Sequence, residues 1–258
     1  MGLFAQREVT GGRPGDPQFH RIASNSCAQH SERLDMTTIK ITEGEAEFFA
    51  PGVGKPCKTW YKVYGDLKSG IRPLVVLHGG PGIPHEYVEV ISQLAYIYAI
   101  PVVLYDQVGN GLSTHLSDKM GDVGFWTVQL FIDELHNLLN HLGIHDDYAL
   151  LGHSWGGMLA SEYAVQEPAG LKKLVIADSP ASMELWVEAV KRLRLQLPQD
   201  IQDTLTKHEE EGTTTDEAYE KATEVFYEHF MCRTKPMPEA LTASFKWMKV
   251  DPTVYFTM

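Results

Sequence analysis

A serine held between glycines is the residue of this chain best suited to chemistry. Residues 152–157 read Gly-His-Ser-Trp-Gly-Gly, and they follow an apolar run at 148–151 that is typical of a buried strand. A helical pattern begins at Met158. This order of strand, sharp turn and helix is the context in which Gly-x-Ser-x-Gly presents a serine hydroxyl for attack on a carbonyl carbon. We therefore predict that Ser154 is a nucleophile.

A second glycine-rich motif could stabilise the charge that such an attack creates on the carbonyl oxygen. Backbone N–H groups aimed at that oxygen commonly supply the largest stabilisation. One donor belongs to the residue after the nucleophile, here Trp155, and the other comes from the loop after the third strand. His-Gly-Gly-Pro-Gly at 78–82 lies in that place. We predict Gly80 as the second donor, with Gly79 as the alternative; a simple Gly-Pro turn is the competing interpretation.

Three further polar residues lie near these motifs, and we expect supporting roles for them. Asp106 begins the glycine-rich loop 106–113, and its strand precedes the nucleophile, whereas a triad acid follows it in this kind of fold. We therefore predict that Asp106 holds its loop over the site. His78 is expected to support the oxyanion loop by hydrogen bonding, and the side chain of His153 to point away from the serine.

The elements that must position these residues alternate along the chain. An alternating pattern between residues 37 and 64, broken by glycine and proline, predicts an antiparallel hairpin. Short apolar runs then alternate with helical patterns, which argues for a mostly parallel sheet with right-handed crossovers. The buried strands are expected at 74–77, 100–105, 147–151 and 174–178, and the helices at 85–98, 128–142 and from 158 onward.

Composition suggests three parts. Residues 1–35 are rich in Gly, Pro, Ser, Gln and His without a hydrophobic period, which predicts a disordered N-terminal extension. Residues 36–180 are expected to form an α/β core with the first six strands. Residues 181–258 contain helical patterns and no strand pattern, so they are expected to form a helical lid that is incomplete. The predicted lid helices are 183–197, 200–211, 215–232 and 239–249.

Charge and cysteine content limit the possible partners. The net charge of −12 argues against nucleic acid, and no apolar run is long enough to span a bilayer. Residues 183–230 carry twelve acidic against five basic side chains, hence a net −7. The three cysteines, Cys27, Cys57 and Cys232, are odd in number and scattered without metal-ligand spacing. They favour a reducing compartment, the cytoplasm. Composition does not predict the oligomeric state.

Three motifs together resemble those of a known family. In chain order they are His-Gly-Gly-Pro-Gly at 78–82, Asp-Gln-x-Gly-x-Gly-x-Ser at 106–113 and Gly-His-Ser-Trp-Gly-Gly at 152–157. The chain is similar in these to the proline iminopeptidases, serine aminopeptidases with an α/β-hydrolase fold whose relatives also cleave amino acid amides. The resemblance implies Ser154 as nucleophile, Gly80 and Trp155 as the oxyanion hole, and no metal or organic cofactor.

The resemblance also implies a substrate class. Such enzymes release N-terminal residues, proline or others, from small peptides or amino acid amides through an acyl-enzyme. They recognise the free α-amino group with carboxylates around the lid. We assign none of the available lid carboxylates to this role, because a charged helix face is usually only solvated. They are Glu209, Glu210, Glu211, Glu224 and Glu228.

A general base for Ser154 is not evident. The histidines after it, His208 and His229, lie in helical lid patterns, and Asp178 ends the sixth strand. In the resembling family the acid and histidine follow the seventh and eighth strands, so we expect this chain to be C-terminally truncated and its activity impaired. The strand at 172–178 should then be an exposed hydrophobic sheet edge.

Two other functions remain open at this stage. The same serine turn serves small-molecule esterases and amidases. A shortened, non-catalytic isoform is the third hypothesis.

Overall fold

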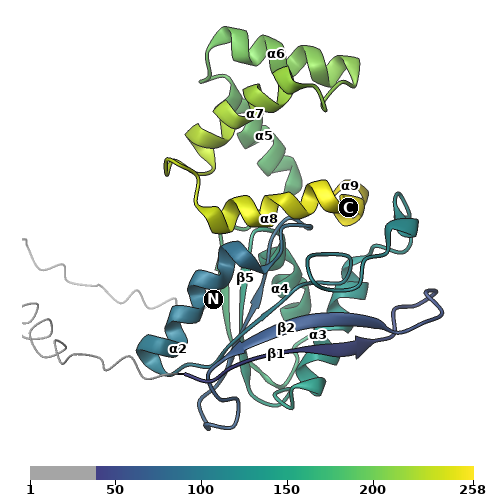
Figure 1. The fold of residues 1–258 in the computed structure, drawn as a ribbon, viewed down its shortest axis with the longest axis vertical. Helices are drawn as coiled ribbons and strands as arrows, with labels where there is room; N and C mark the ends of the chain where they lie inside the picture. The colour runs from purple at the N-terminus through teal and green to yellow at the C-terminus, as the bar shows by residue number, and fades with distance from the viewer. Residues whose placement is uncertain (1–38) are drawn as a thin grey trace, which may run out of the picture. The chain divides into compact units, whose positions relative to one another are not determined.

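The computed structural model describes residues 39–258, which form a six-stranded mixed sheet with helices (Figure 1). The predicted extension at 1–35 lies outside the described residues. The strands are β1 (Ile41–Phe48), β2 (Cys57–Tyr64), β3 (Leu74–Leu77), β4 (Val102–Tyr105), β5 (Tyr148–His153) and β6 (Leu171–Ala177).

The sheet order is β1-β2-β4-β3-β5-β6. β1 pairs antiparallel with β2, and β2 pairs antiparallel with β4. The remaining pairs, β4 with β3, β3 with β5 and β5 with β6, are parallel. The predicted hairpin and parallel sheet are therefore confirmed. β3 lies between β4 and β5, so strands that follow β3 in the sequence are found on both sides of it in the sheet.

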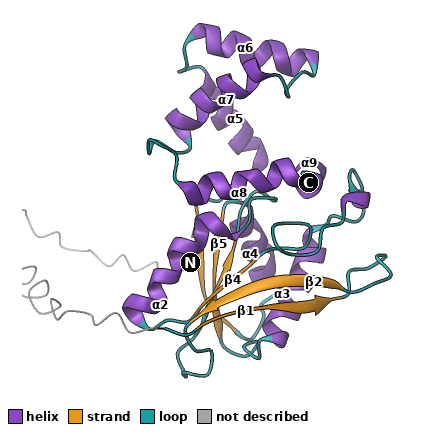
Figure 2. Ribbon diagram, viewed as in Figure 1, coloured by secondary structure: helices purple, strands orange, loops and turns teal. Residues whose placement is uncertain are grey.

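Helices alternate with strands from β3 to β6, and only helices follow β6 in the chain (Figure 2). Those among the core strands are the 3-10 helices η1 (His85–Ser92) and η2 (Ser117–Lys119), and the α-helices α2 (Gln93–Tyr98), α3 (Val128–His141) and α4 (Trp155–Val165). Those of the later part are α5 (Met183–Arg194), α6 (Gln199–Glu211), α7 (Glu217–Phe230), α8 (Glu239–Val250) and α9 (Thr253–Thr257). The helix predicted at 85–98 is thus a 3-10 helix in its first half. No helix among the described residues combines the length and apolarity needed to cross a bilayer.

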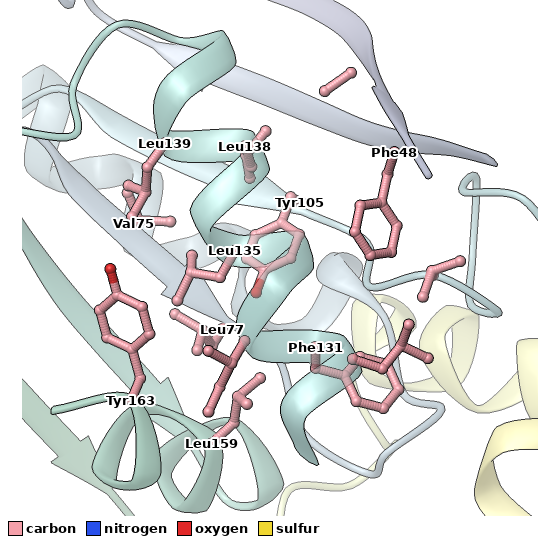
Figure 3. Close-up of a cluster of buried hydrophobic side chains, with 14 of the residues drawn as sticks. Phe48, Val75, Leu77, Tyr105, Phe131, Leu135, Leu138, Leu139, Leu159 and Tyr163 are labelled. Atoms are coloured by element: carbon pink, nitrogen blue, oxygen red, sulfur yellow. The ribbon is translucent and has the colours of Figure 1, made fainter. Parts of the chain in front are cut away.

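The two faces of the sheet are covered separately. Because side chains alternate along a strand, Val75 and Leu77 face one layer and Val76 faces the other. The first layer contains buried side chains of α3 and α4, as the close-up in Figure 3 shows for Leu135 and Leu159. The second layer contains η1 and α2. This three-layer packing is what holds the ends of β3, β4 and β5 in place.

The later helices show the four segments predicted for the lid, with α9 in addition. α6 and α7 pack together around a small apolar cluster that includes Leu205 and Ala222. α8 packs against η1 in the core. There the indole Nε1–H of Trp247 donates to Glu86 over 2.7 Å.

Asp251, between α8 and α9, anchors this end of the chain to the loop after β4. Its carboxylate accepts hydrogen bonds from Ser117 Oγ and from Nδ1–H of His115, both over 2.8 Å, and from the Thr253 N–H over 3.0 Å. Burial opposes ionisation, but these bonds from Thr253, Ser117 and His115 outweigh it and lower the pKa of Asp251 to about 2.

The β6 strand is the edge of the sheet, as predicted. It pairs with β5 on one side, and Val175 and Ile176 are 46% and 51% exposed. An unpaired apolar edge of this kind is a template for association with another strand.

A buried carboxyl group lies beneath the loop that follows β4. Glu134 of α3 is fully buried and accepts hydrogen bonds from the Val108 N–H, at 2.9 Å, and from the Thr59 hydroxyl. Burial raises the pKa of Glu134 from 4.5 to about 8. The group is therefore protonated in the folded protein at neutral pH.

Replacing Glu134 by glutamine should remove a pH dependence of stability. Between pH 4.5 and 8 the folded state holds a proton that the unfolded state has lost. As the pH rises from 4.5 to 8, the wild-type free energy of unfolding should therefore fall by at most about 1.4 kcal/mol per pH unit. Above pH 8 it should level off. Urea unfolding of the wild type and Glu134→Gln at several pH values measures the difference. Parallel curves for the two proteins would contradict the assignment.

Candidate active site

Ser154 occupies a strained turn between β5 and α4. Its backbone angles are φ 54° and ψ −120°, a region that residues with a side chain rarely adopt. Its N–H donates to the Ala177 carbonyl over 3.0 Å, which ties the turn to the end of β6. Strain of this kind persists where the surrounding structure holds it, and it is typical of catalytic sites.

Two glycines make the turn possible. A Cβ on Gly152 would overlap the carbonyl oxygen of Gly156, and a Cβ on Gly156 would overlap that of Leu77. The first turn of α4 therefore lies directly against β5 and the end of β3. No larger residue fits at either position.

The hydroxyl of Ser154 makes no hydrogen bond among the described residues. Ser154 is the N-cap of α4, yet its side chain makes no capping hydrogen bond, and the residue is half-buried. Within residues 39–258, no side chain is hydrogen bonded to its Oγ. The serine thus lies at the positive end of a helix dipole with its oxygen uncommitted.

The loop at 78–82 meets the serine directly. A Cβ on Gly79 would lie 3.1 Å from Cβ of Ser154. The Gly79 N–H, however, donates to the hydroxyl of Tyr87 over 2.7 Å. Among the described residues, neither Gly80 nor Trp155 has a hydrogen-bond acceptor for its N–H. This favours Gly80 over Gly79 as the donor, the first of the two sequence alternatives.

A chain of hydrogen bonds links the three motifs beneath the site. Nδ1–H of His78 donates to the Gly79 carbonyl and its Nε2 accepts the Gln107 N–H, both over 3.0 Å. The Gln107 amide then donates to the His78 carbonyl over 3.1 Å and accepts the Trp155 indole N–H over 2.9 Å. Burial lowers the pKa of His78, so the ring is neutral and has one donor and one acceptor. The hydrogen bond of His78 to Gly79 lies within the loop for which a supporting role was predicted, and that role stays a prediction.

Asp106 forms a buried pair with a histidine that sequence reasoning missed. Its Oδ1 is 2.8 Å from Nδ1 of His85 and accepts the His85 backbone N–H over 2.9 Å, while Oδ2 accepts the Leu112 N–H over 2.9 Å. Burial works against the charged ring, but the hydrogen bond and charge of Asp106 raise the pKa of His85. A Cβ on Gly111, where φ is +54°, would overlap the same carboxylate. Asp106 thus holds both ends of its loop.

The His153 ring has its polar contacts with Tyr87 and Asp178 and is not hydrogen bonded to Ser154. Its Nδ1 is 2.8 Å from the Tyr87 hydroxyl, and its Nε2 is 3.9 Å from a carboxylate oxygen of the exposed Asp178. Burial lowers the pKa of His153, although the charge of Asp178 opposes this. The ring is therefore neutral and already engaged on the side of Tyr87.

The later histidines are hydrogen bonded to other groups, and the five glutamates considered for substrate binding are exposed. Nδ1 of His208 is 2.7 Å from the Thr213 hydroxyl, and Nδ1–H of His229 donates to the Val225 carbonyl over 2.8 Å. Two of these glutamates form ion pairs, Glu209 with Arg194 and Glu228 with Lys235. All five are exposed, namely Glu209, Glu210, Glu211, Glu224 and Glu228.

Sequence reasoning did not identify three residues that connect the site: Tyr87, His85 and Gln107. Gln107 lies inside a recognised motif, so its position was available as a signal. Tyr87 and His85 lie in a predicted helix without a motif of their own. The contact of Tyr87 with His153 spans 66 residues of sequence, and that of His85 with Asp106 spans 21, so both depend on the fold.

Comparison with known proteins shows the family of this chain. A family model described as the alpha/beta hydrolase fold matches residues 72–254. The crystal structure of the proline iminopeptidase of Mycobacterium smegmatis is 44% identical to this chain, with a TM-score of 0.72, over 83% of this chain and 70% of that one. The chain belongs to the proline iminopeptidase family of α/β hydrolases.

Two other relatives give the extent of the match. The proline iminopeptidase of Clostridium botulinum is 37% identical over 71% of this chain. The crystal structure of VinJ is 51% identical with a TM-score of 0.79, over 84% of this chain and 70% of that one. The chain spans 59% of the length of the Clostridium botulinum relative.

Adding one methyl group at the serine turn should damage the fold. Because a Cβ on Gly156 would overlap backbone atoms of Leu77 and His78, Gly156→Ala should lower the free energy of unfolding by about 3 kcal/mol. Gly124→Ala is the matched control, since the nearest atom to its Cβ would be Asp122 Oδ1 at 3.5 Å. The control should change stability by less than about 0.5 kcal/mol. Equal losses in urea unfolding would show that α4 can move away from β3.

Removing the charge of Asp106 should lower the pKa of His85. The carboxylate that favours the protonated ring is lost, while burial still disfavours that ring. Asp106→Asn should also lower the free energy of unfolding by about 3 kcal/mol, as loss of one partner of a buried pair does. NMR titration of the His85 ring and urea unfolding measure the two effects. Asp146→Asn is the control, since the Asp146 side chain is 91% exposed beside His145. An unchanged His85 titration would contradict the pairing.

Proposed function

We propose that this protein is a serine hydrolase that releases N-terminal residues, proline or others, from small peptides or amino acid amides. The single observation that carries the proposal is the strained conformation of Ser154 at the start of α4, with its hydroxyl uncommitted. The similarity to proline iminopeptidases supports the choice of substrate class.

The chemistry would proceed in two steps. Ser154 Oγ attacks the carbonyl carbon of the N-terminal residue, and the N–H groups of Gly80 and Trp155 stabilise the negative oxygen. The C–N bond then breaks, the amine leaves with the proton that the Ser154 hydroxyl has lost, and the residue remains as an ester on Ser154. Water hydrolyses this acyl-enzyme and releases the free amino acid. The network through His78, Gln107 and Trp155 keeps the donors in position between steps.

Substrate selection would rest on the free α-amino group. The acidic later helices offer exposed carboxylates that can approach a cation, and Glu210, Glu211 and Glu224 form no ion pair among the described residues. We single out none of them as the ligand. The excess negative charge supports a small cationic partner over nucleic acid or a membrane surface. The cysteine pattern supports the cytoplasm as the compartment.

The proton of the Ser154 hydroxyl needs an acceptor. No histidine among residues 39–258 is hydrogen bonded to Ser154, and both acid and base of the triad are therefore unassigned. We propose that the 258-residue chain alone is impaired, since loss of one triad member costs roughly 10⁶-fold in turnover in a measured case.

Turnover and labelling separate the parts of this proposal. The 258-residue chain should cleave a prolyl-arylamide roughly 10⁶-fold more slowly than the Mycobacterium smegmatis enzyme. A fluorophosphonate probe should label it slowly, at Ser154, and should not label Ser154→Ala.

Each other outcome has a definite meaning. Equal labelling of the wild type and Ser154→Ala would show that Ser154 is not the nucleophile. Turnover close to that of the relative would show that the chain is not impaired. Faster cleavage of a short acyl ester than of the arylamide would favour an esterase instead.

A further inference from the structure

The hydroxyl of Tyr87 joins the two loops that meet at Ser154. It accepts the Gly79 N–H over 2.7 Å and lies 2.8 Å from Nδ1 of His153. The first bond uses an oxygen lone pair and leaves the hydroxyl hydrogen available. The half-buried His153 ring is neutral, and the Asp178 carboxylate 3.9 Å from Nε2 favours the tautomer that carries its hydrogen on Nε2, so Nδ1 accepts the tyrosine hydrogen. One oxygen atom therefore bridges the oxyanion loop and the residue before the nucleophile.

We propose that Tyr87 is a positioning residue of the oxyanion hole, a role that rests on the function proposed above. By holding the Gly79 N–H, it removes that donor from the site and orients the next peptide, so that the Gly80 N–H is the one available to substrate. The space is already filled around Gly79, where a Cβ would lie 2.9 Å from the Tyr87 hydroxyl and 3.2 Å from the His153 carbonyl. The loop has little freedom to find another arrangement while the hydroxyl is present.

Tyr87 is held in turn by α8. The Tyr87 backbone N–H donates to Ser244 Oγ over 3.1 Å, and Ser244 is itself fully buried. The Ser244 hydroxyl lies 3.1 Å from the Pro84 carbonyl and 3.2 Å from Glu86, which also accepts the Trp247 indole N–H over 2.7 Å. The position of the oxyanion loop thus depends on the seating of α8 against η1.

The substitution Tyr87→Phe removes only the bridging oxygen and tests the proposal without turnover. Exchange of the Gly79 amide hydrogen with D₂O should quicken about tenfold, as expected for loss of one hydrogen bond. The ¹⁵N signal of His153 Nδ1 should shift toward that of a nitrogen without a donor. Tyr96→Phe, in α2, is the matched control, because the Tyr96 hydroxyl makes no hydrogen bond among the described residues. Unchanged Gly79 and His153 signals in Tyr87→Phe would overturn the proposal.

Labelling of Ser154 by a fluorophosphonate adds a readout of the oxyanion hole. Attack of Ser154 on the probe builds negative charge on the phosphoryl oxygen in the transition state, where the proposed donors would stabilise it. The rate constant should therefore fall about tenfold in Tyr87→Phe and less than about twofold in Tyr96→Phe. If the wild type is labelled and Tyr87→Phe reacts equally fast, the role of Tyr87 is wrong while the nucleophile stands. If Ser154→Ala is labelled like the wild type, the proposed function fails, and the exchange and ¹⁵N measurements still decide the role of Tyr87.

Discussion

The close approach of α4 to the end of β3 is the constraint on which the site depends. Gly156 lies on the Leu77 carbonyl with no room for a side chain. β3 and β5 are neighbouring parallel strands at the point where the sheet order reverses, so the loops after both lie at the same edge of the sheet. The loop at 78–82 and the serine turn therefore meet because of sheet topology. The strain at Ser154 persists because β5 and β6 hold one side of the turn and α4 holds the other.

Buried polar groups stabilise the loops that this topology brings together. His78 and Gln107 join the loops after β3 and β4 to Trp155, while Asp106 and His85 join the loop after β4 to η1. Each group is buried and each bond is made to a different segment of the chain. Such a network is worth most when all members are satisfied, because an unpaired polar group in the interior is costly. It explains how loops rich in glycine can present donors in fixed directions.

The elements that could be predicted from the sequence are those with local causes. Ser154 could be placed because its motif, the apolar run before it and the helix after it are contiguous. The parallel strands and four later helices follow from apolar runs and helical periods in the same way. The 3-10 form of residues 85–92 was not predicted, and neither was α9 at residues 253–257. Both segments are short, and they pack against parts of the chain far away in sequence.

The supporting residues of the site escaped prediction for the same reason. Tyr87 gains its partners from Gly79, His153 and Ser244, which belong to three separate elements. Asp106 was expected to hold its loop, but nothing in the pattern identified His85 as its partner. Conversely, the helices carrying His208 and His229 were predicted, and these side chains bond within the same region of the chain. Pairings between distant segments depend on tertiary packing, which a single sequence does not display.

Serine enzymes combine two tasks, which are to form an anion on the substrate and to hold it. The N–H groups near Ser154 that have no acceptor among the described residues bear on the second task alone. Holding an anion needs only fixed dipoles, here the N–H groups of Gly80 and Trp155 and the amino end of α4. Making that anion from a neutral substrate needs a mobile proton acceptor as well. Under the proposed function, the donors that hold the anion lie within residues 39–258, whereas no proton acceptor is assigned among them. A compound that arrives with its negative oxygen already formed, as a tetrahedral boronate does, would meet a complementary site without any proton having to move.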